Sequence, residues 1–280
     1  MNKAAQKKIE VYAHWVGLRL PTIMGFLSVT PLRGKEIFSF EYHDAWLKNP
    51  YAFVLDPALQ FFSGAHYVPK GQEIFGVFSD SSPDRWGRML MKRREAQVAR
   101  EEGRKPRTLL ESDYLLGVCD AHRMGALRFK TESTGPFLDN NKLYAAPPWA
   151  SLRNLEQVSL ALEQEGVEQS PDYSIWLQML VAPGRSLGGA RPKASITDPE
   201  KHLWIAKFPS GSDEVDIGAW EMVAYRLAQH AQITLSDAQI KKFKSSHHTF
   251  LSKRFDRTNT GERLHFVSAM TMLGYSDGAE

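Results

Sequence analysis

The sequence predicts an α+β protein in two parts, and three observations lead to this prediction. Short alternating apolar runs typical of strands, such as residues 36–42, are mixed with longer segments of helical periodicity. A stretch rich in Gly, Pro, Asp and Asn at residues 131–148 separates an N-terminal mixed α/β subdomain from the rest of the chain. After this stretch, the order of strand-like and helix-like segments indicates an antiparallel sheet with a helix packed on it.

Composition limits the possible classes of protein. The 280 residues are 42% hydrophobic and 24% charged, with a formal net charge of +3, so charge alone indicates neither a nucleic-acid nor a membrane partner. Cys119 is the only cysteine, which excludes an internal disulfide framework and is typical of a reducing compartment. We find no signal-peptide pattern and no apolar run of about 20 residues, and therefore expect a cytoplasmic protein without a membrane partner.

The N-terminal part is expected to alternate between strands and helices. Residues 36–42 and 73–78 are strand-like, and Ser81 or Ser82 is expected to cap a helix that has Pro83 at its first position and ends near Gly103. A second helix begins at residues 111–116, and residues 125–129 form a closing strand. This places a first domain at 1–135 and a linker at 136–150.

The C-terminal part begins with two helices, one over residues 155–166 and one from residue 170 to about 180. Two strands follow, at 193–197 and 203–207, and then a helix of about a dozen residues starting near Gly218. Its apolar stripe consists of Trp220, Val223, Ala224 and Leu227. Residues 237–243 and 249–257 supply two further strands, residues 263–266 are strand-like, and residues 268–273 form a short helix.

The glycine-rich segment at residues 185–193 carries the strongest functional signal. Gly188 and Gly189 leave the backbone free to approach a polyanion with its amide groups. Lys207 is the single charged residue in an apolar strand-like run. This is the placement of a lysine that reaches a nucleotide phosphate from a buried strand. Glu221 lies in the first turn of the next helix, where an ion pair with Lys207 is geometrically reasonable. This order of elements is that of a protein-kinase small lobe.

Ordinary structural explanations exist for the same residues. A Gly-Gly pair beside a strand is often a plain turn, a strand lysine can extend to solvent, and Glu221 can be an exposed helix residue. The basic run at residues 85–107 is either a solvated helix face or an electrostatic contact with nucleic acid or an acidic partner. His247 and His248 lack a third ligand at useful spacing, so no metal site is predicted.

Several motifs in one order resemble the HipA-type serine/threonine kinase toxins of bacterial type II toxin–antitoxin modules. In the N-terminal part they are residues 78–84, 113–117 and 125–127. In the C-terminal part they are Ser186 with residues 188–190, Lys193, residues 205–209 and residues 253–257. The resemblance covers nearly the whole chain. It implies a HipA N-terminal-like subdomain at 1–135 and a kinase-like small lobe at 151–265.

The resemblance also implies roles for individual residues. Gly188, Gly189, Ala190, Lys193, Lys207 and Glu221 would form the nucleotide site, Lys253 and Phe255 would contact adenine, and Ser186 would be an autophosphorylation site. The implied cofactors are ATP and magnesium. The implied partners are a HipB-like DNA-binding antitoxin and a protein substrate such as an aminoacyl-tRNA synthetase. Contact with nucleic acid would be indirect, through the antitoxin.

The sequence departs from the kinase pattern after Arg257. A kinase needs a catalytic Asp with an Asn five positions later, followed by a metal-binding Asp, and residues 258–280 contain no such pair. We therefore expect a chain truncated before the catalytic loop, with only the start of a large lobe at 266–280, no catalytic residue and weak ATP binding. The alternative is a degenerate pseudokinase or binding module that engages an antitoxin or another partner without catalysis. Exposed apolar side chains are expected around Phe266, Met270, Met272 and Leu273.

Overall fold

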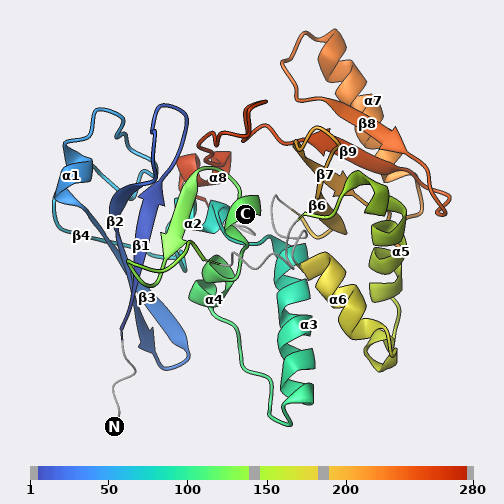
Figure 1. Cartoon of the computed structure of the whole chain (residues 1–280), viewed down its shortest axis with the longest axis horizontal. Coiled ribbons are helices and arrows are strands. Elements are labelled where there is room, and N and C mark those ends of the chain that lie inside the picture. The colour runs from blue at the N-terminus through green and yellow to red at the C-terminus, as the bar shows by residue number, and fades with distance from the viewer. Residues whose placement is uncertain (1–5, 139–145, 182–188, 276–280) are drawn as a thin grey trace. The chain divides into compact units, whose positions relative to one another are not determined.

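The computed structural model describes residues 6–138, 146–181 and 189–275 (Figure 1). It confirms the α+β class, because helices accompany two antiparallel sheets. The chain divides into two compact units that are discontinuous in sequence. Unit 1 comprises Met1–Pro83, Thr108–Asn141 and Glu262–Glu280, and unit 2 comprises Asp84–Arg107 and Lys142–Gly261. Residues 84–107 thus group with the C-terminal sheet, and residues 262–280 group with the N-terminal one.

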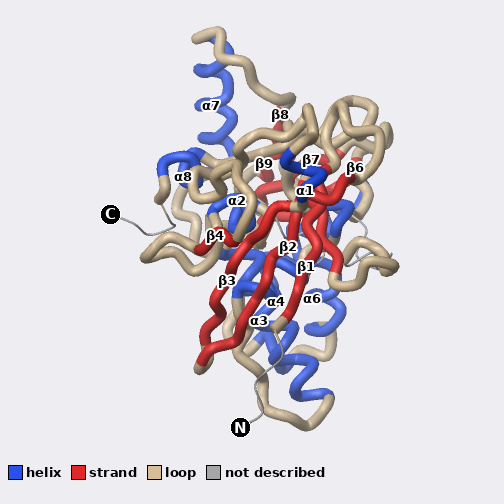
Figure 2. The backbone as a smooth tube through the Cα atoms, turned by 90° about the vertical axis from the view of Figure 1, so that its left-hand side faces the viewer, coloured by secondary structure: helices blue, strands red, loops and turns tan. Residues whose placement is uncertain are grey.

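Unit 1 is built on a five-stranded antiparallel sheet in the order β4-β3-β2-β1-β5. Figure 2 shows β1, β2 and β3 side by side. Ile9, Val11 and Ala13 alternate with more exposed residues along β1 and face the core. The strands are β1 Lys7–Ala13, β2 Thr22–Leu32, β3 Lys35–Tyr42, β4 Ala65–Tyr67 and β5 Leu127–Lys130. The strands expected at 36–42 and 125–129 are therefore confirmed, the second with a shift of its bounds.

The helices of unit 1 are short: α1 Asp44–Leu47, α2 Gly76–Asp80, α4 Glu111–Leu116 and α8 Ala269–Leu273. The prediction of a strand at residues 73–78 is wrong, because α2 begins there with Phe75 as its N-cap. Phe75, Val77 and Phe78 are all buried in the core of unit 1. A short apolar run that is buried on several sides has no clear period, so periodicity alone does not separate helix from strand.

The last described residues complete unit 1. The prediction of a strand at 263–266 is wrong, since no strand forms there; Val16 N–H donates to the Arg263 carbonyl oxygen at 3.0 Å. The helix expected at 268–273 is confirmed as α8, with Ser268 as its N-cap. Asp80 of α2 accepts hydrogen bonds from the Ser268 amide at 2.7 Å and the Thr271 hydroxyl at 2.9 Å. As expected, Met270, Met272 and Leu273 are exposed, whereas Phe266 is half-buried.

Unit 2 combines a four-stranded antiparallel sheet, in the order β6-β7-β9-β8, with four helices among its described residues. The strands are β6 Lys193–Thr197, β7 Leu203–Lys207, β8 Ala238–Lys241 and β9 Thr249–Lys253. The helices are α3 Arg85–Glu101, α5 Leu152–Leu162, α6 Tyr173–Val181 and α7 Ile217–His230. The apolar faces of α3, α5 and α6 pack with β6 and β7 into one core.

The start of α3 differs from the expected one. Asp84, and neither serine, is the N-cap, and its carboxylate accepts the Gly87 amide at 2.8 Å. The hydroxyls of Ser81 and Ser82 instead donate to carbonyl oxygens of α2, at 3.1 and 2.8 Å, so they are already engaged by the preceding helix. Pro83 therefore precedes the cap instead of opening the helix.

The basic side chains of residues 85–107 are partly paired within unit 2. Arg104 contacts Glu95 at 2.6 Å, Arg100 donates to the Glu168 carbonyl oxygen at 3.0 Å, and Arg93 donates to the Leu162 carbonyl oxygen. These contacts favour the interpretation of the basic run at residues 85–107 as a solvated helix face whose charges are partly paired within the protein.

The apolar stripe of α7 does not face the sheet. Trp220 and Leu227 are 62% and 64% exposed, and Val223 is also exposed. The half-buried apolar residues of α7 lie at other positions, namely Ile217, Ala219, Met222, Tyr225 and Ala228. The residues of the predicted stripe do lie in α7. The helix contacts β8 and β9 through a different face.

Across the described parts of the chain, none of the helices combines the length and the apolar character that a membrane crossing requires.

Candidate functional site

The expected ion pair between Lys207 and Glu221 is present. Lys207 ends β7, Glu221 lies near the start of α7, and Lys207 Nζ is 2.5 Å from Glu221 Oε2. The two side chains are 35% and 26% exposed, so a ligand can reach the pair. The ring of Phe250, which is paired with Lys207 across β7 and β9, lies 5.5 Å from the ammonium.

The loop that precedes β9 fixes the beginning of α7 and thereby the position of Glu221. Asp216 caps the helix by accepting a hydrogen bond from the Ala219 amide. Its carboxylate also accepts hydrogen bonds from the backbone amide and the ring nitrogen of His248, at 2.9 and 2.5 Å. Burial alone would raise the pKa of Asp216, but these hydrogen bonds lower it to about 2. Gly218 permits the close approach, because a Cβ atom at this position would lie 2.0 Å from the His248 carbonyl oxygen.

Lys193 is buried, in contrast to Lys207. Its side chain is 2% exposed, and its Nζ lies 2.6 Å from Asp84 Oδ2 and 3.1 Å from the Gly189 carbonyl oxygen. Burial lowers the pKa of Lys193 and raises that of Asp84, and each charge compensates the other in the same enclosed space. A direct contact of Lys193 with a nucleotide stays a prediction, and the structure gives its ammonium two partners within the protein.

The glycine-rich bend is described only from Gly189 onward, so Ser186 and Gly188 lie outside the described residues. Gly189 has φ of 111°, a backbone conformation that side-chain-bearing residues rarely adopt, and the space where a Cβ would be is open. Arg191 fixes the chain after the bend, because its guanidinium binds both carboxylate oxygens of Asp213, at 2.7 and 2.6 Å. Ala190 is exposed.

The two residues expected at adenine lie at the end of β9 and just after it. Lys253 pairs with Trp204 in the sheet, three positions from the pairing of Phe250 with Lys207, and its Nζ donates to Asn259 Oδ1 at 3.0 Å. Phe255 is 49% exposed. The neighbouring residues Arg254 and Asp256 form a fully buried ion pair. The Arg257 guanidinium also contacts the Asp256 carboxylate, at 2.6 Å, so Asp256 has a structural role.

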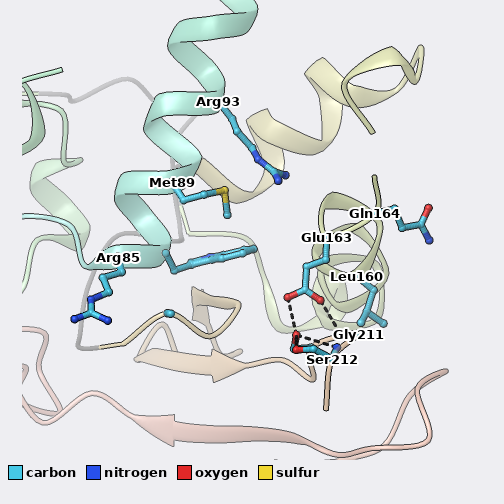
Figure 3. Close-up of a pocket in the computed structure, with 11 residues that line it drawn as sticks. Arg85, Met89, Arg93, Leu160, Glu163, Gln164, Gly211 and Ser212 are labelled. Carbon is cyan, nitrogen blue, oxygen red and sulfur yellow. Dashed lines mark hydrogen bonds between the residues drawn. The ribbon is translucent and has the colours of Figure 1, made fainter. Parts of the chain in front are cut away.

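A cavity of about 810 Å³ lies beside the bend within unit 2 (Figure 3). Trp86, Met89 and Arg93 of α3 line it from one side, and the end of α5 with residues 210–212 lines it from the other. Glu163 holds residues 210–212 in place by accepting the Ser210 hydroxyl at 2.9 Å and the Gly211 amide at 2.6 Å. Among the predicted site residues that the structure describes, Ala190 alone lines this cavity.

Sequence reasoning missed the role of Asp84, which the structure brings to Lys193 from 109 positions away. The available signal was its position just before a long helix, which predicted only a favourable interaction with the helix dipole. Asp198, Glu200 and His202 form a separate cluster of side chains that could act as metal ligands, with their ligand atoms within 4.8 Å of one another. Asp198 is already the acceptor for the His202 amide and the Trp204 ring N–H, so we assign no metal to it.

Unit 2 is thus an antiparallel sheet that carries a glycine bend, a strand lysine and an ion-paired helix glutamate. Residues 185–280 match the family model of the HipA-like C-terminal domain. This match covers roughly a third of the chain, and in these residues the chain is similar to HipA-like proteins. No curated protein sequence matches the chain.

Proposed function

We propose that unit 2 binds the phosphates of an adenine nucleotide at Lys207 and the glycine bend, in the manner of HipA-type serine/threonine kinases of toxin–antitoxin modules. The observation that carries this proposal is the Lys207–Glu221 ion pair, which is accessible and lies on the expected elements. In protein kinases a lysine on a strand, held by a helix glutamate, contacts nucleotide phosphates. The open space at Gly189 is compatible with a phosphate held against the backbone.

Magnesium fits the site less well than the nucleotide does. The carboxylates of Asp84 and Glu221 lie beside the predicted phosphate-binding lysines, and each is already paired with one of them. When bound with ATP, magnesium neutralises phosphate charge. The protein itself would bind the phosphates through the Lys207 ammonium, which Glu221 orients, and through the backbone amides of the bend.

We further propose that the 280 residues bind nucleotide weakly and transfer no phosphate by themselves. Residues 258–280 contain no Asp followed by an Asn five positions later, which the catalytic loop of a kinase requires. Where such a loop is supplied, the reaction would be transfer of the ATP γ-phosphoryl group to a protein hydroxyl. By resemblance, the hydroxyls are Ser186 and a residue of an aminoacyl-tRNA synthetase.

A binding role without catalysis is the second candidate, and the exposed stripe on α7 favours it. Trp220, Val223 and Leu227 expose apolar area on one helix, and such a surface is typical of a protein contact. The HipB-like antitoxin that the family resemblance implies is a candidate partner of this kind.

Thermal shift with ADP tests nucleotide binding even when affinity is low, because stabilisation grows with ligand concentration relative to Kd. Wild type is expected to gain stability with millimolar ADP, Lys207→Met to lose the gain, and the control Lys201→Met, an exposed lysine in the turn of the same hairpin, to keep it. Equal shifts in wild type and Lys207→Met would refute the site. Intact mass after incubation with ATP and magnesium tests transfer, and a phosphate on Ser186 would contradict the inactive state.

A further inference from the structure

The two lysines at the glycine bend are neighbours but have opposite access to solvent. Lys193 and Lys207 are directly paired across β6 and β7, so their side chains leave the same face of the sheet. The side chain of Lys207 is 35% exposed, whereas that of Lys193 is 2% exposed. Each has its own carboxylate, Glu221 for Lys207 and Asp84 for Lys193.

The contacts of Lys193 join the bend to the beginning of α3. Its ammonium donates to Gly189 on the bend and to Asp84, which at the same time caps α3 through the Gly87 amide. The Lys193 carbonyl oxygen accepts the indole N–H of Trp86 at 3.0 Å, so side chain and backbone are both held by the first turn of α3. A segment more than a hundred residues earlier in the chain therefore fixes the end of the bend.

We propose that Asp84 and Lys193 are positioning residues that hold the Gly189 end of the bend at a fixed place beside Lys207, and that Lys193 is not itself a phosphate ligand. This inference rests on the proposed nucleotide-binding function. Because the Lys193 ammonium is buried and bonds to Asp84 and to the Gly189 carbonyl oxygen, we assign the pair to holding the bend in place. The phosphate contacts are left to Lys207 and to the backbone amides of the bend.

Three variants of the full 280-residue chain separate positioning from direct binding. Asp84→Asn keeps a good helix cap and an intact Lys193, but removes the negative charge that holds the ammonium. The double variant Asp84→Asn/Lys193→Met removes both charges, which avoids a buried unpaired ion if the single variant folds poorly. Lys207→Met is the matched control, because it removes a lysine from the same face without touching the bend.

Two measurements apply to each variant. The first is hydrogen–deuterium exchange of residues 189–191, which needs no nucleotide. The second is the ratio of affinities for ADP and adenosine, obtained from thermal-shift titrations. The ratio isolates the phosphate contribution, so a general loss of stability, which weakens both ligands alike, leaves it unchanged.

We expect both Asp84 variants to exchange faster at the bend and to lose phosphate-dependent affinity by about ten-fold, with adenosine affinity preserved. In Lys207→Met the ratio of ADP affinity to adenosine affinity is expected to fall as well, while the bend exchanges as in wild type. Unchanged exchange at the bend in the Asp84 variants would overturn the proposal. A preserved or increased ratio in Asp84→Asn would also overturn it, because a released Lys193 would then be binding phosphate directly.

Failure of the proposed function gives a different result. If wild type shows no preference for ADP over adenosine, phosphate binding is refuted. The exchange data alone then decide whether Asp84 and Lys193 hold the bend, and faster exchange in both Asp84 variants supports the positioning role.

Discussion

The imidazole of His265 is expected to make unit 1 sensitive to acid. It lies against the rings of Trp15 and Phe53, with centroids 5.4 and 5.7 Å away. In the described part of the structure neither ring nitrogen has a hydrogen-bond partner. Burial lowers the pKa of His265 from 6.5 to about 4, since a charged ring would lose its hydration without gaining a partner.

The direction of the effect follows from proton linkage. Between pH 6.5 and 4 the unfolded chain binds a proton at His265 and the folded chain does not, so stability is present above this range and is lost as pH falls. The size of the pKa difference gives a loss of about 2 kcal/mol between pH 7 and pH 5. The substitution His265→Phe removes the titration and keeps a ring in the same space.

Urea denaturation of wild type and His265→Phe at a series of pH values measures this term. We expect the free energy of unfolding of wild type to fall more steeply toward pH 5, by about 2 kcal/mol relative to the variant. Groups such as His14 titrate in both proteins and cancel in the comparison. Parallel pH profiles would show that His265 is protonated equally well in the folded chain, and the reasoning would be refuted.

Two further predictions concern α7. Gly218→Ala is expected to destabilise the protein by about 2 kcal/mol, because its Cβ would meet the His248 carbonyl oxygen at 2.0 Å; a melting temperature equal to that of wild type would show that the helix start moves freely. The double substitution Trp220→Gln/Leu227→Gln is expected to reduce aggregation, measured by light scattering at rising concentration, with no drop in melting temperature, because both side chains are exposed; a large drop would show instead that they pack in the core.

Local signals were sufficient for the elements around the bend. The strand at 193–197, the strand ending at Lys207 and the Lys207–Glu221 pair were all predicted, because each depends on residues close together in sequence. An alternating strand, a tight turn and a capped helix constrain one another over such short distances.

Contacts between distant segments were beyond the reach of sequence periodicity. No local pattern joins Asp84 to Lys193, and the tertiary environment decides that residues 76–80 form a helix. The outward stripe of α7 was missed for a related reason. The helix has apolar residues on more than one face, and only the packing shows which face the sheet covers.

The interleaved order of the two units affects how the protein can be synthesised and dissected. The chain passes between them four times, so neither unit corresponds to a continuous fragment. The partners of Asp80, Ser268 and Thr271, come 188 and 191 positions later in the sequence. On the ribosome unit 1 therefore stays incomplete until residues 262–280 have emerged, and a gene fragment that begins at residue 136 would lack α3 together with Asp84.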